Sequence, residues 1–175
     1  RANLKKIKYE SSNQVFPSSV KCIKFGITFN HPIYRNTLPD SLTELYFGEA
    51  FEQPLEKGLL PSSITKLTFE RGFYHQDLLD WIPHSVTKLQ IGHIHTDQRK
   101  NERPWNIVFP IEKLLNTLVS SLILGDRETI ESTDLIPSNI KEIRLCKCNI
   151  IKHIPTTIEA LYLGNSHNEP LNKYF

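Results

Sequence analysis

The chain has 175 residues and a formal net charge of +2 at pH 7, with 23% charged residues. This length allows one domain with a sizeable core, and a charge this small gives no overall field that would attract nucleic acid. The sequence also lacks an apolar run of about 18 residues, which excludes a membrane-spanning helix.

A 22-residue repeat organises the chain. Pro17, Pro39, Pro61 and Pro83 follow one another at this interval, which lies in the range typical of solenoids and propellers. Apolar residues stand three, six and eight positions after each proline, and the same triplet continues through later copies with looser spacing. The triplets are Leu4, Ile7, Tyr9; Val20, Ile23, Phe25; Leu42, Leu45, Phe47; Ile64, Leu67, Phe69; Val86, Leu89, Ile91; Val119, Leu122, Leu124; Ile140, Ile143, Leu145; and Ile158, Leu161, Leu163.

The triplets predict short parallel strands. Positions six and eight alternate with outward-facing neighbours, as in a half-buried strand. Such a strand must pair with the equivalent strand of the next copy, and the rest of each copy supplies the return path that parallel pairing requires. We therefore expect residues 1–175 to form a single mostly β solenoid of about eight coils, each burying its apolar residues against its neighbours.

Residues 1–16 are expected to form an N-terminal capping coil. No proline precedes their triplet, and a polar segment, residues 10–14, follows it. The terminal copies of a repeat array are commonly atypical because one of their faces meets water.

Further positions recur in the regular array, residues 17–92. The proline of each copy is expected to preset an extended backbone before the strand. Asn36 and Gly58 occupy equivalent places, and both residue types tolerate the left-handed conformation. A shared threonine position predicts a row of hydroxyls across adjacent strands. Its members are Thr43, Thr65 and Thr87.

An insertion of 11 residues interrupts the array, because Asn116, the next position equivalent to the prolines, follows Pro83 after 33 residues. The polar composition of residues 93–104 predicts a loop beside the strands. His93 and His95 alternate with Asp97 and could ligate zinc in an extended backbone, but nothing fixes them in place, so a surface loop is the preferred interpretation. Candidate interaction residues in this loop are His93, His95, Arg99, Lys100 and Arg103.

The spacing and residue types of the repeat resemble those of the FNIP repeat, a 22-residue variant of the leucine-rich repeat. The segments that carry the resemblance are Phe29-Asn30-His31-Pro32-Ile33 and Phe51-Glu52-Gln53-Pro54-Leu55. The resemblance implies a leucine-rich-repeat-like curved solenoid, of the α/β repeat type but mostly β, with a parallel sheet on the concave face and irregular convex returns. It also implies protein binding, and for some family members an adaptor role in a ubiquitin ligase through an F-box. No F-box is evident in these residues, so that role is an analogy.

The outward strand positions, five and seven residues after each proline position, form a stripe with six basic and two acidic residues. Its net charge of +4 favours a protein partner with an acidic or phosphorylated segment. Lysine is also a common occupant of exposed strands, where it discourages aggregation, and a nucleic-acid partner is the alternative function. The predicted binding residues are Lys6, Lys8, Lys24, Glu44, Tyr46, Lys66, Lys88, Gln90, Ile123, Arg144 and Tyr162; the other stripe positions are Cys22, Thr68, Ser121, Glu142 and Ala160.

An enzymatic function is not expected, and neither is a cofactor. Cys22 has basic neighbours that could lower the pKa of its thiol, but no histidine stands near it in the stripe to act as a base. Cys22 and Cys146 are five coils apart, beyond disulfide reach. The odd number of cysteines, three, and the lack of an Asn-x-Ser/Thr acceptor predict a reducing, cytoplasmic location.

Overall fold

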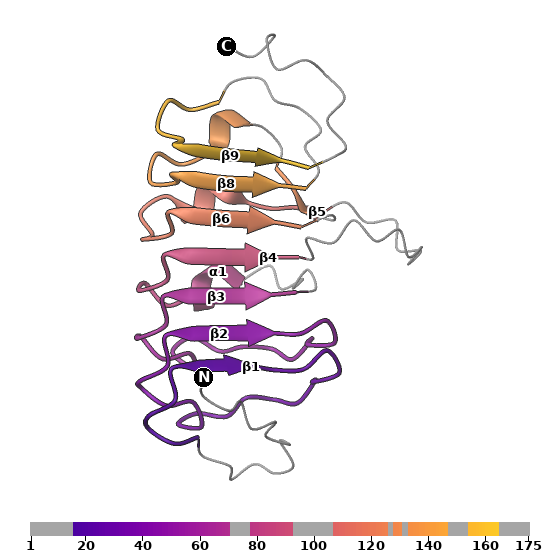
Figure 1. Ribbon diagram of the computed structural model, residues 1–175, viewed down its shortest axis with the longest axis vertical. Coiled ribbons are helices and arrows are strands. Elements are labelled where there is room, and N and C mark those ends of the chain that lie inside the picture. The colour runs from indigo at the N-terminus through magenta and orange to yellow at the C-terminus, as the bar shows by residue number, and fades with distance from the viewer. Residues whose placement is uncertain are drawn as a thin grey trace, which may run out of the picture.

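The computed structural model describes residues 16–70, 78–92, 107–125, 128–130, 133–146 and 154–164, without the side chains of Leu78 and Ile107. Seven short strands form one sheet in the order β1-β2-β3-β4-β6-β8-β9, and every neighbouring pair is parallel (Figure 1). The strands are β1 (Cys22–Lys24), β2 (Glu44–Phe47), β3 (Lys66–Phe69), β4 (Lys88–Ile91), β6 (Ser121–Leu124), β8 (Glu142–Leu145) and β9 (Ala160–Leu163).

The strand register follows the repeat. Leu45, Leu67 and Leu89 pair in turn across β2, β3 and β4. The register continues across the long copy, where Leu89 pairs with Leu122, and through the shorter copies that follow. Seven of the eight predicted triplets therefore stack as expected, and the eighth, in residues 1–15, lies outside the described residues.

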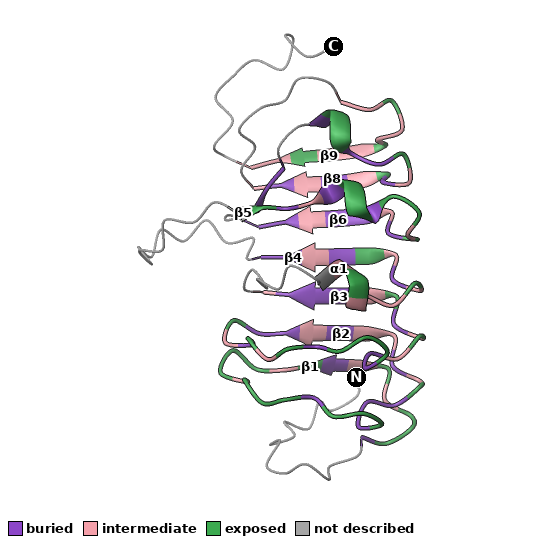
Figure 2. Ribbon diagram, turned by 180° about the vertical axis from the view of Figure 1, so that it is seen from behind, coloured by how far each residue is buried: buried purple, intermediate pink, exposed green. Residues whose placement is uncertain are grey.

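The return paths lie behind the sheet (Figure 2). They contain the short helix α1 (Leu78–Trp81) and the 3-10 helices η1 (Ile111–Leu114) and η2 (Thr133–Leu135). They also contain a second, two-stranded parallel sheet made of β5 (Ile107–Val108) and β7 (Glu128–Thr129). The predicted mostly β solenoid, with a parallel sheet on one face and irregular returns, is confirmed.

The core lies between the sheet and the returns. Leu45, Leu67 and Leu122 are fully buried, as are most triplet residues between β2 and β8. In the first coils the core is a column of stacked aromatic rings, with centroids 5.5 Å apart for Phe25 and Phe47 and 5.0 Å apart for Phe47 and Phe69. Burying a side chain of this kind contributes about 1.5 to 3 kcal/mol, so neighbouring coils stabilise one another.

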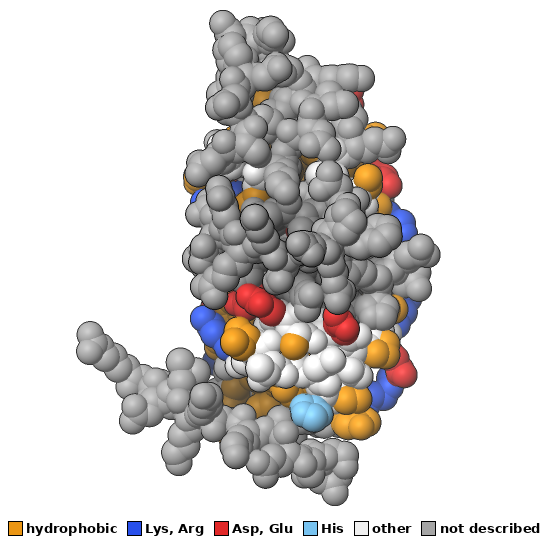
Figure 3. All heavy atoms as spheres, turned by 90° about the vertical axis from the view of Figure 1, so that its right-hand side faces the viewer, with side chains coloured by type: hydrophobic (Ala, Val, Ile, Leu, Met, Phe, Trp, Pro, Cys, Tyr) orange, Lys and Arg blue, Asp and Glu red, His pale blue; other side chains and the backbone are white. Residues whose placement is uncertain are grey.

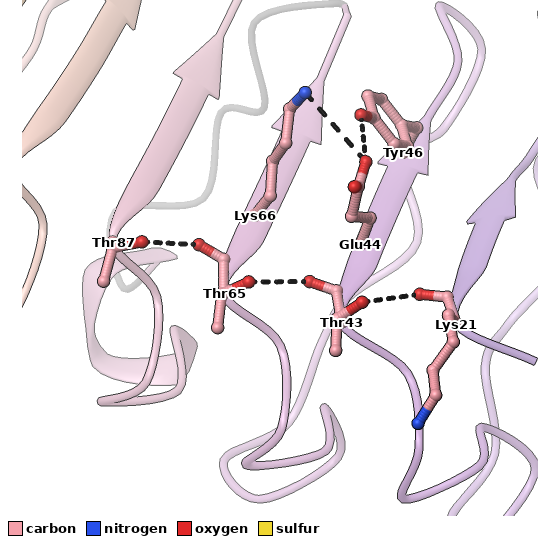
Figure 4. A network of polar contacts seen from close by, with 7 residues as sticks. All are labelled: Lys21, Thr43, Glu44, Tyr46, Thr65, Lys66 and Thr87. Atoms are coloured by element: carbon pink, nitrogen blue, oxygen red, sulfur yellow. Dashed lines mark hydrogen bonds and ion pairs between the residues drawn. The ribbon is translucent and has the colours of Figure 1, made fainter.

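Polar ladders join successive coils at the start of the strands. Ser41, Ser63 and Ser85 each donate a hydroxyl hydrogen bond, 2.6 to 2.7 Å long, to a carbonyl of the preceding coil. The predicted row of threonines forms a second ladder, in which Thr65 donates to the Thr43 carbonyl and Thr87 to the Thr65 carbonyl (Figure 4). The carbonyls of Thr43 and Thr65 each accept two backbone amides of the next coil as well, so the threonine hydroxyls add to bonds that already join the coils.

The regularly spaced prolines lie at tight turns that precede the strands. Each of these prolines occupies the first position of a turn, in which its carbonyl accepts a hydrogen bond from the amide three residues later, as from Leu42 to Pro39 at 3.0 Å. The left-handed residues are as predicted, with φ of 63° at Asn36 and 77° at Gly58.

Asn116 is not equivalent to the prolines, which corrects the sequence alignment of the long copy. Its φ of 70° matches that of Asn36, and Thr117 bonds back to Leu114 as Thr37 bonds to Tyr34, each through a hydroxyl at 2.7 Å. The coil before β6 therefore lacks the proline turn. Asn139 of the next coil supplies hydrogen bonds in place of the missing turn. Its amide nitrogen donates to the carbonyls of Leu114, Thr117 and Val119 at 3.1, 3.3 and 2.8 Å.

Candidate protein-binding face

The outward strand positions form two parallel rows on the side of the sheet opposite the returns, and we call these rows the sheet face. Each row is set by the strand register, which places equivalent residues of neighbouring coils side by side at about 4.8 Å. The first row is Cys22, Glu44, Lys66, Lys88, Ser121, Glu142 and Ala160; the second is Lys24, Tyr46, Thr68, Gln90, Ile123, Arg144 and Tyr162.

Nine of the eleven predicted binding residues lie on the sheet face. Lys6 and Lys8 fall outside the described residues, and so do the loop candidates His93, His95, Arg99, Lys100 and Arg103. The described part of the face carries four basic and two acidic residues, so half of the predicted charge excess lies in the described coils.

Tyr46 is the centre of a cluster of charged residues on β1, β2 and β3. Its hydroxyl donates to the Glu44 carboxylate at 2.6 Å, and the Lys66 ammonium lies 4.0 Å from the same carboxylate (Figure 4). The ammonium groups of Lys24 and Lys66 lie 4.4 and 5.2 Å from the centre of the Tyr46 ring. Burial and the bond to Glu44 raise the pKa of Tyr46, so the hydroxyl stays protonated at neutral pH.

The thiol of Cys22 is not activated, contrary to the effect considered from its basic neighbours. Burial, followed by the nearby Glu44 carboxylate, raises the pKa of Cys22, and these effects outweigh the lowering by Lys24 and Lys66. Because the thiolate is the nucleophilic form, a raised pKa makes this cysteine a poor nucleophile. Cys22 is a free thiol.

A second aromatic and cationic pair lies at the other end of the face. The Arg144 guanidinium on β8 lies 4.6 Å from the centre of the Tyr162 ring on β9. Tyr162 is 44% exposed, and Ile123 on β6 is half-buried beside Arg144 in the same row. Tyrosine, arginine and apolar residues in such a row are those enriched at protein interfaces.

The middle of the face holds two adjacent lysines and a buried hydroxyl. Lys66 and Lys88 are direct neighbours on β3 and β4, and Lys88 is exposed. Thr68, two residues beyond Lys66, is only 3% exposed although its position faces away from the core, and its hydroxyl has no hydrogen-bond partner in the described part of the chain. The sequence placed Thr68 in the stripe but gave no sign that its hydroxyl is buried, because that depends on its neighbours Tyr46 and Gln90.

The other surfaces of the described residues show fewer features of a binding site than the sheet face. At the carboxyl ends of the strands, the described surface mixes uncharged, acidic and apolar groups (Figure 3). Lysine and arginine side chains lie at the margins of this view (Figure 3). Within the described ranges, no three potential metal ligands come together. No helix in the same ranges is long and apolar enough to cross a membrane.

Comparison with known proteins agrees with this architecture. A similar solved structure is that of CroV588, a novel circular LRR protein, with 28% sequence identity and a TM-score of 0.58 over 87% of this chain. The chain spans 22% of the length of that protein. None of the curated proteins matches the chain. The fold is therefore a leucine-rich-repeat-like solenoid.

Part of the chain also matches a known repeat family. Residues 12–50 and 51–93 match the model of the FNIP Repeat. These two segments match FNIP repeats, as the resemblance of the sequence predicted.

Proposed function

We propose that this protein is a non-enzymatic recognition module that binds another protein on its sheet face. The observation that carries the proposal is the continuous face of seven strands, with Tyr46 between two lysines at one end and the Tyr162–Arg144 pair at the other. A repeat fold and a leucine-rich-repeat-like architecture, which typically serve as binding scaffolds, support this function.

The partner is expected to present an acidic or phosphorylated segment. Basic residues outnumber acidic ones on the described face, and long-range attraction to a negative segment would speed the encounter. Nucleic acid is the alternative partner, but Glu44 and Glu142 would repel phosphates along a backbone, and Lys24 and Arg144 already stack on tyrosine rings.

The biological role that fits best is the substrate-recognition part of a ubiquitin-ligase adaptor in the cytoplasm. The role in a ligase rests on analogy with FNIP-repeat proteins that carry an F-box. The free thiol of Cys22 fits a reducing compartment.

Partner capture tests the function. Lys66→Glu/Lys88→Glu is compared with Lys57→Glu/Lys113→Glu, which makes the same change of charge at exposed positions on the return paths. We expect proteins captured from host lysate by the unaltered chain and the control pair to be lost with the sheet-face pair. Equal capture by both variants would remove the sheet face from consideration. Loss of capture after nuclease treatment would favour the nucleic-acid alternative.

A further inference from the structure

We propose that Lys66, Lys88 and Thr68 form a binding site for one phosphoryl group, carried by a phosphoserine or phosphothreonine of the partner protein. This inference rests on the proposed protein-binding function and specifies the chemistry that the middle of the sheet face recognises. Three observations carry it: the adjacent lysines, the local charge, and the buried hydroxyl beside them.

The two lysines are held next to each other by the fold. Lys66 and Lys88 are Cα partners in the parallel register of β3 and β4, so their side chains leave the sheet about 4.8 Å apart on the same side. Like charges directly opposite each other destabilise a sheet. An anion bound between the two ammonium groups would relieve this repulsion.

The charges around this place sum to that of a phosphate dianion. Lys24, Lys66 and Lys88 are the basic residues of β1, β3 and β4 on the face, and Glu44 of β2 is the acidic one, which leaves a net charge of +2. A phosphoserine carries about −1.5 to −2 at pH 7, whereas a carboxylate carries about −1. A carboxylate would therefore neutralise only half of the local excess.

Thr68 supplies an uncharged donor in the second row. Its hydroxyl is buried and has no hydrogen-bond partner among the described residues, although a buried polar group without a partner is costly and native structures rarely keep one without a role. Two ammonium groups and one hydroxyl match the three strong acceptor oxygens of a phosphoryl group.

The surroundings allow the site to open and the lysines to reach it. Lys66 already leans towards the second row, because its ammonium lies 5.2 Å from the ring of Tyr46, the neighbour of Thr68 on β2. On the other side, Gln90 is half-buried and its amide donates a long bond, 3.4 Å, to the Gly92 carbonyl. A bond of this length is weak, so the Gln90 side chain can turn aside to admit a ligand to Thr68.

The glutamate competes with the ligand for one of the lysines. Glu44 contacts Lys66 at 4.0 Å and is held in place by the Tyr46 hydroxyl at 2.6 Å. A phosphoryl group at the site must displace the Glu44 carboxylate from Lys66 or share the ammonium with it. Removing the charge of Glu44 should therefore strengthen binding of the ligand.

The experiment titrates the full chain with three peptides of about five residues each. The backbone amide resonances of the protein report the binding. The peptides are identical except for a central phosphoserine, serine or aspartate. We expect the phosphoserine peptide to shift the amides of Lys66, Thr68, Lys88 and Gln90 most, and to bind roughly tenfold tighter than the aspartate peptide. Equal binding of the phosphoserine and serine peptides would overturn the proposal, and equal binding of the phosphoserine and aspartate peptides would assign the site to carboxylates instead.

Variants locate the binding. Lys66→Glu/Lys88→Glu should weaken phosphoserine binding at least about tenfold, Glu44→Gln should strengthen it a few fold, and Lys57→Glu/Lys113→Glu should leave it unchanged. Thr68→Val, which keeps the shape of the side chain, should weaken binding of the phosphoserine peptide several fold. The same loss with the return-path pair as with the sheet-face pair would show non-specific attraction and overturn the site.

The pH dependence of binding distinguishes titration of the ligand from titration of groups on the protein. Phosphoserine loses its second proton near pH 6, so its affinity should rise between about pH 5.5 and about pH 7.5. The charged groups that face the site are Lys24, Glu44, Lys66 and Lys88, and the other titratable groups are Cys22 and Tyr46, whose pKa values are raised. The aspartate peptide reports any titration of these groups, and an equal rise for both peptides would contradict a phosphate ligand.

The proposed function can survive if this inference fails. A partner whose capture depends on Ile123 and Tyr162, together with no response to the phosphoserine peptide, would contradict the phosphoryl site and keep the protein-binding face. No dependence on any residue of the sheet face would contradict both.

Discussion

Removing the Thr68 hydroxyl should stabilise the fold but weaken ligand binding. Its buried hydroxyl lacks a partner in the described part of the chain, so replacing it by a methyl group of the same shape removes an unpaired polar atom. We expect Thr68→Val to raise the free energy of unfolding by about 1 kcal/mol, measured by urea denaturation.

Thr37 is the matched control for this change. It is 5% exposed, and its hydroxyl donates to the Tyr34 carbonyl at 2.7 Å. Thr37→Val should therefore lower the free energy of unfolding by about 1 to 2 kcal/mol. If both valine variants were destabilised alike, the Thr68 hydroxyl would have a partner in the folded protein.

For individual residues, the sequence predicted which side chains face outward but not how they interact. Alternation along each strand placed Lys24, Tyr46 and Lys66 on one face, because side chains of a strand alternate whatever their identity. The ring contacts of Tyr46 and the raised pKa of Cys22 depend on distances between coils and on burial, which spacing does not encode.

Neighbouring coils approach each other closely where the chain turns out of the sheet after β2. A Cβ added at Gly48 would overlap the backbone carbonyl of Gly26 in the preceding coil, whereas a Cβ at Gly26 would meet no atom of the described residues within 4 Å. We expect Gly48→Ala to destabilise the protein by about 1 to 3 kcal/mol in thermal or urea unfolding, because the coils must move apart.

Gly26→Ala is the internal control, since both glycines follow a strand at the same place in the repeat. It should leave the free energy of unfolding within about 0.5 kcal/mol of the unaltered chain. Equal losses in the two variants would mean that these glycines are needed for the turn itself and not for the contact between coils.

Element boundaries were predictable wherever the repeat is regular. The strands at 22-residue intervals, and the register across the longer copy, follow from the apolar triplets alone. The alignment of Asn116 with the prolines was wrong because sequence spacing was extended through a copy that omits a turn. Only the left-handed backbone at Asn116 and the bonds of Asn139 to three carbonyls reveal the omission.

For the molecule as a whole, a one-dimensional stack should be strongest in its middle. Leu67 is fully buried between Leu45 and Leu89, whereas Leu161 on β9 is half-buried next to Ile143. Leu67→Ala should cost about 3 to 5 kcal/mol, and Leu161→Ala less than about 2 kcal/mol, by urea denaturation. Equal costs would indicate that the coil of β9 is covered as completely as the central ones.

The one-to-one pairing of β2, β3 and β4 also bears on how such a chain can change its length. Because each residue of one coil meets its counterpart 22 positions later, duplicating or deleting a complete coil would preserve the leucine, phenylalanine, serine and threonine contacts on both sides of the junction. A change of a single residue within a strand would instead turn its buried side chains outwards. Genes for this architecture can therefore grow or shrink by whole coils, and each new coil adds one more pair of outward side chains with which to acquire a different partner.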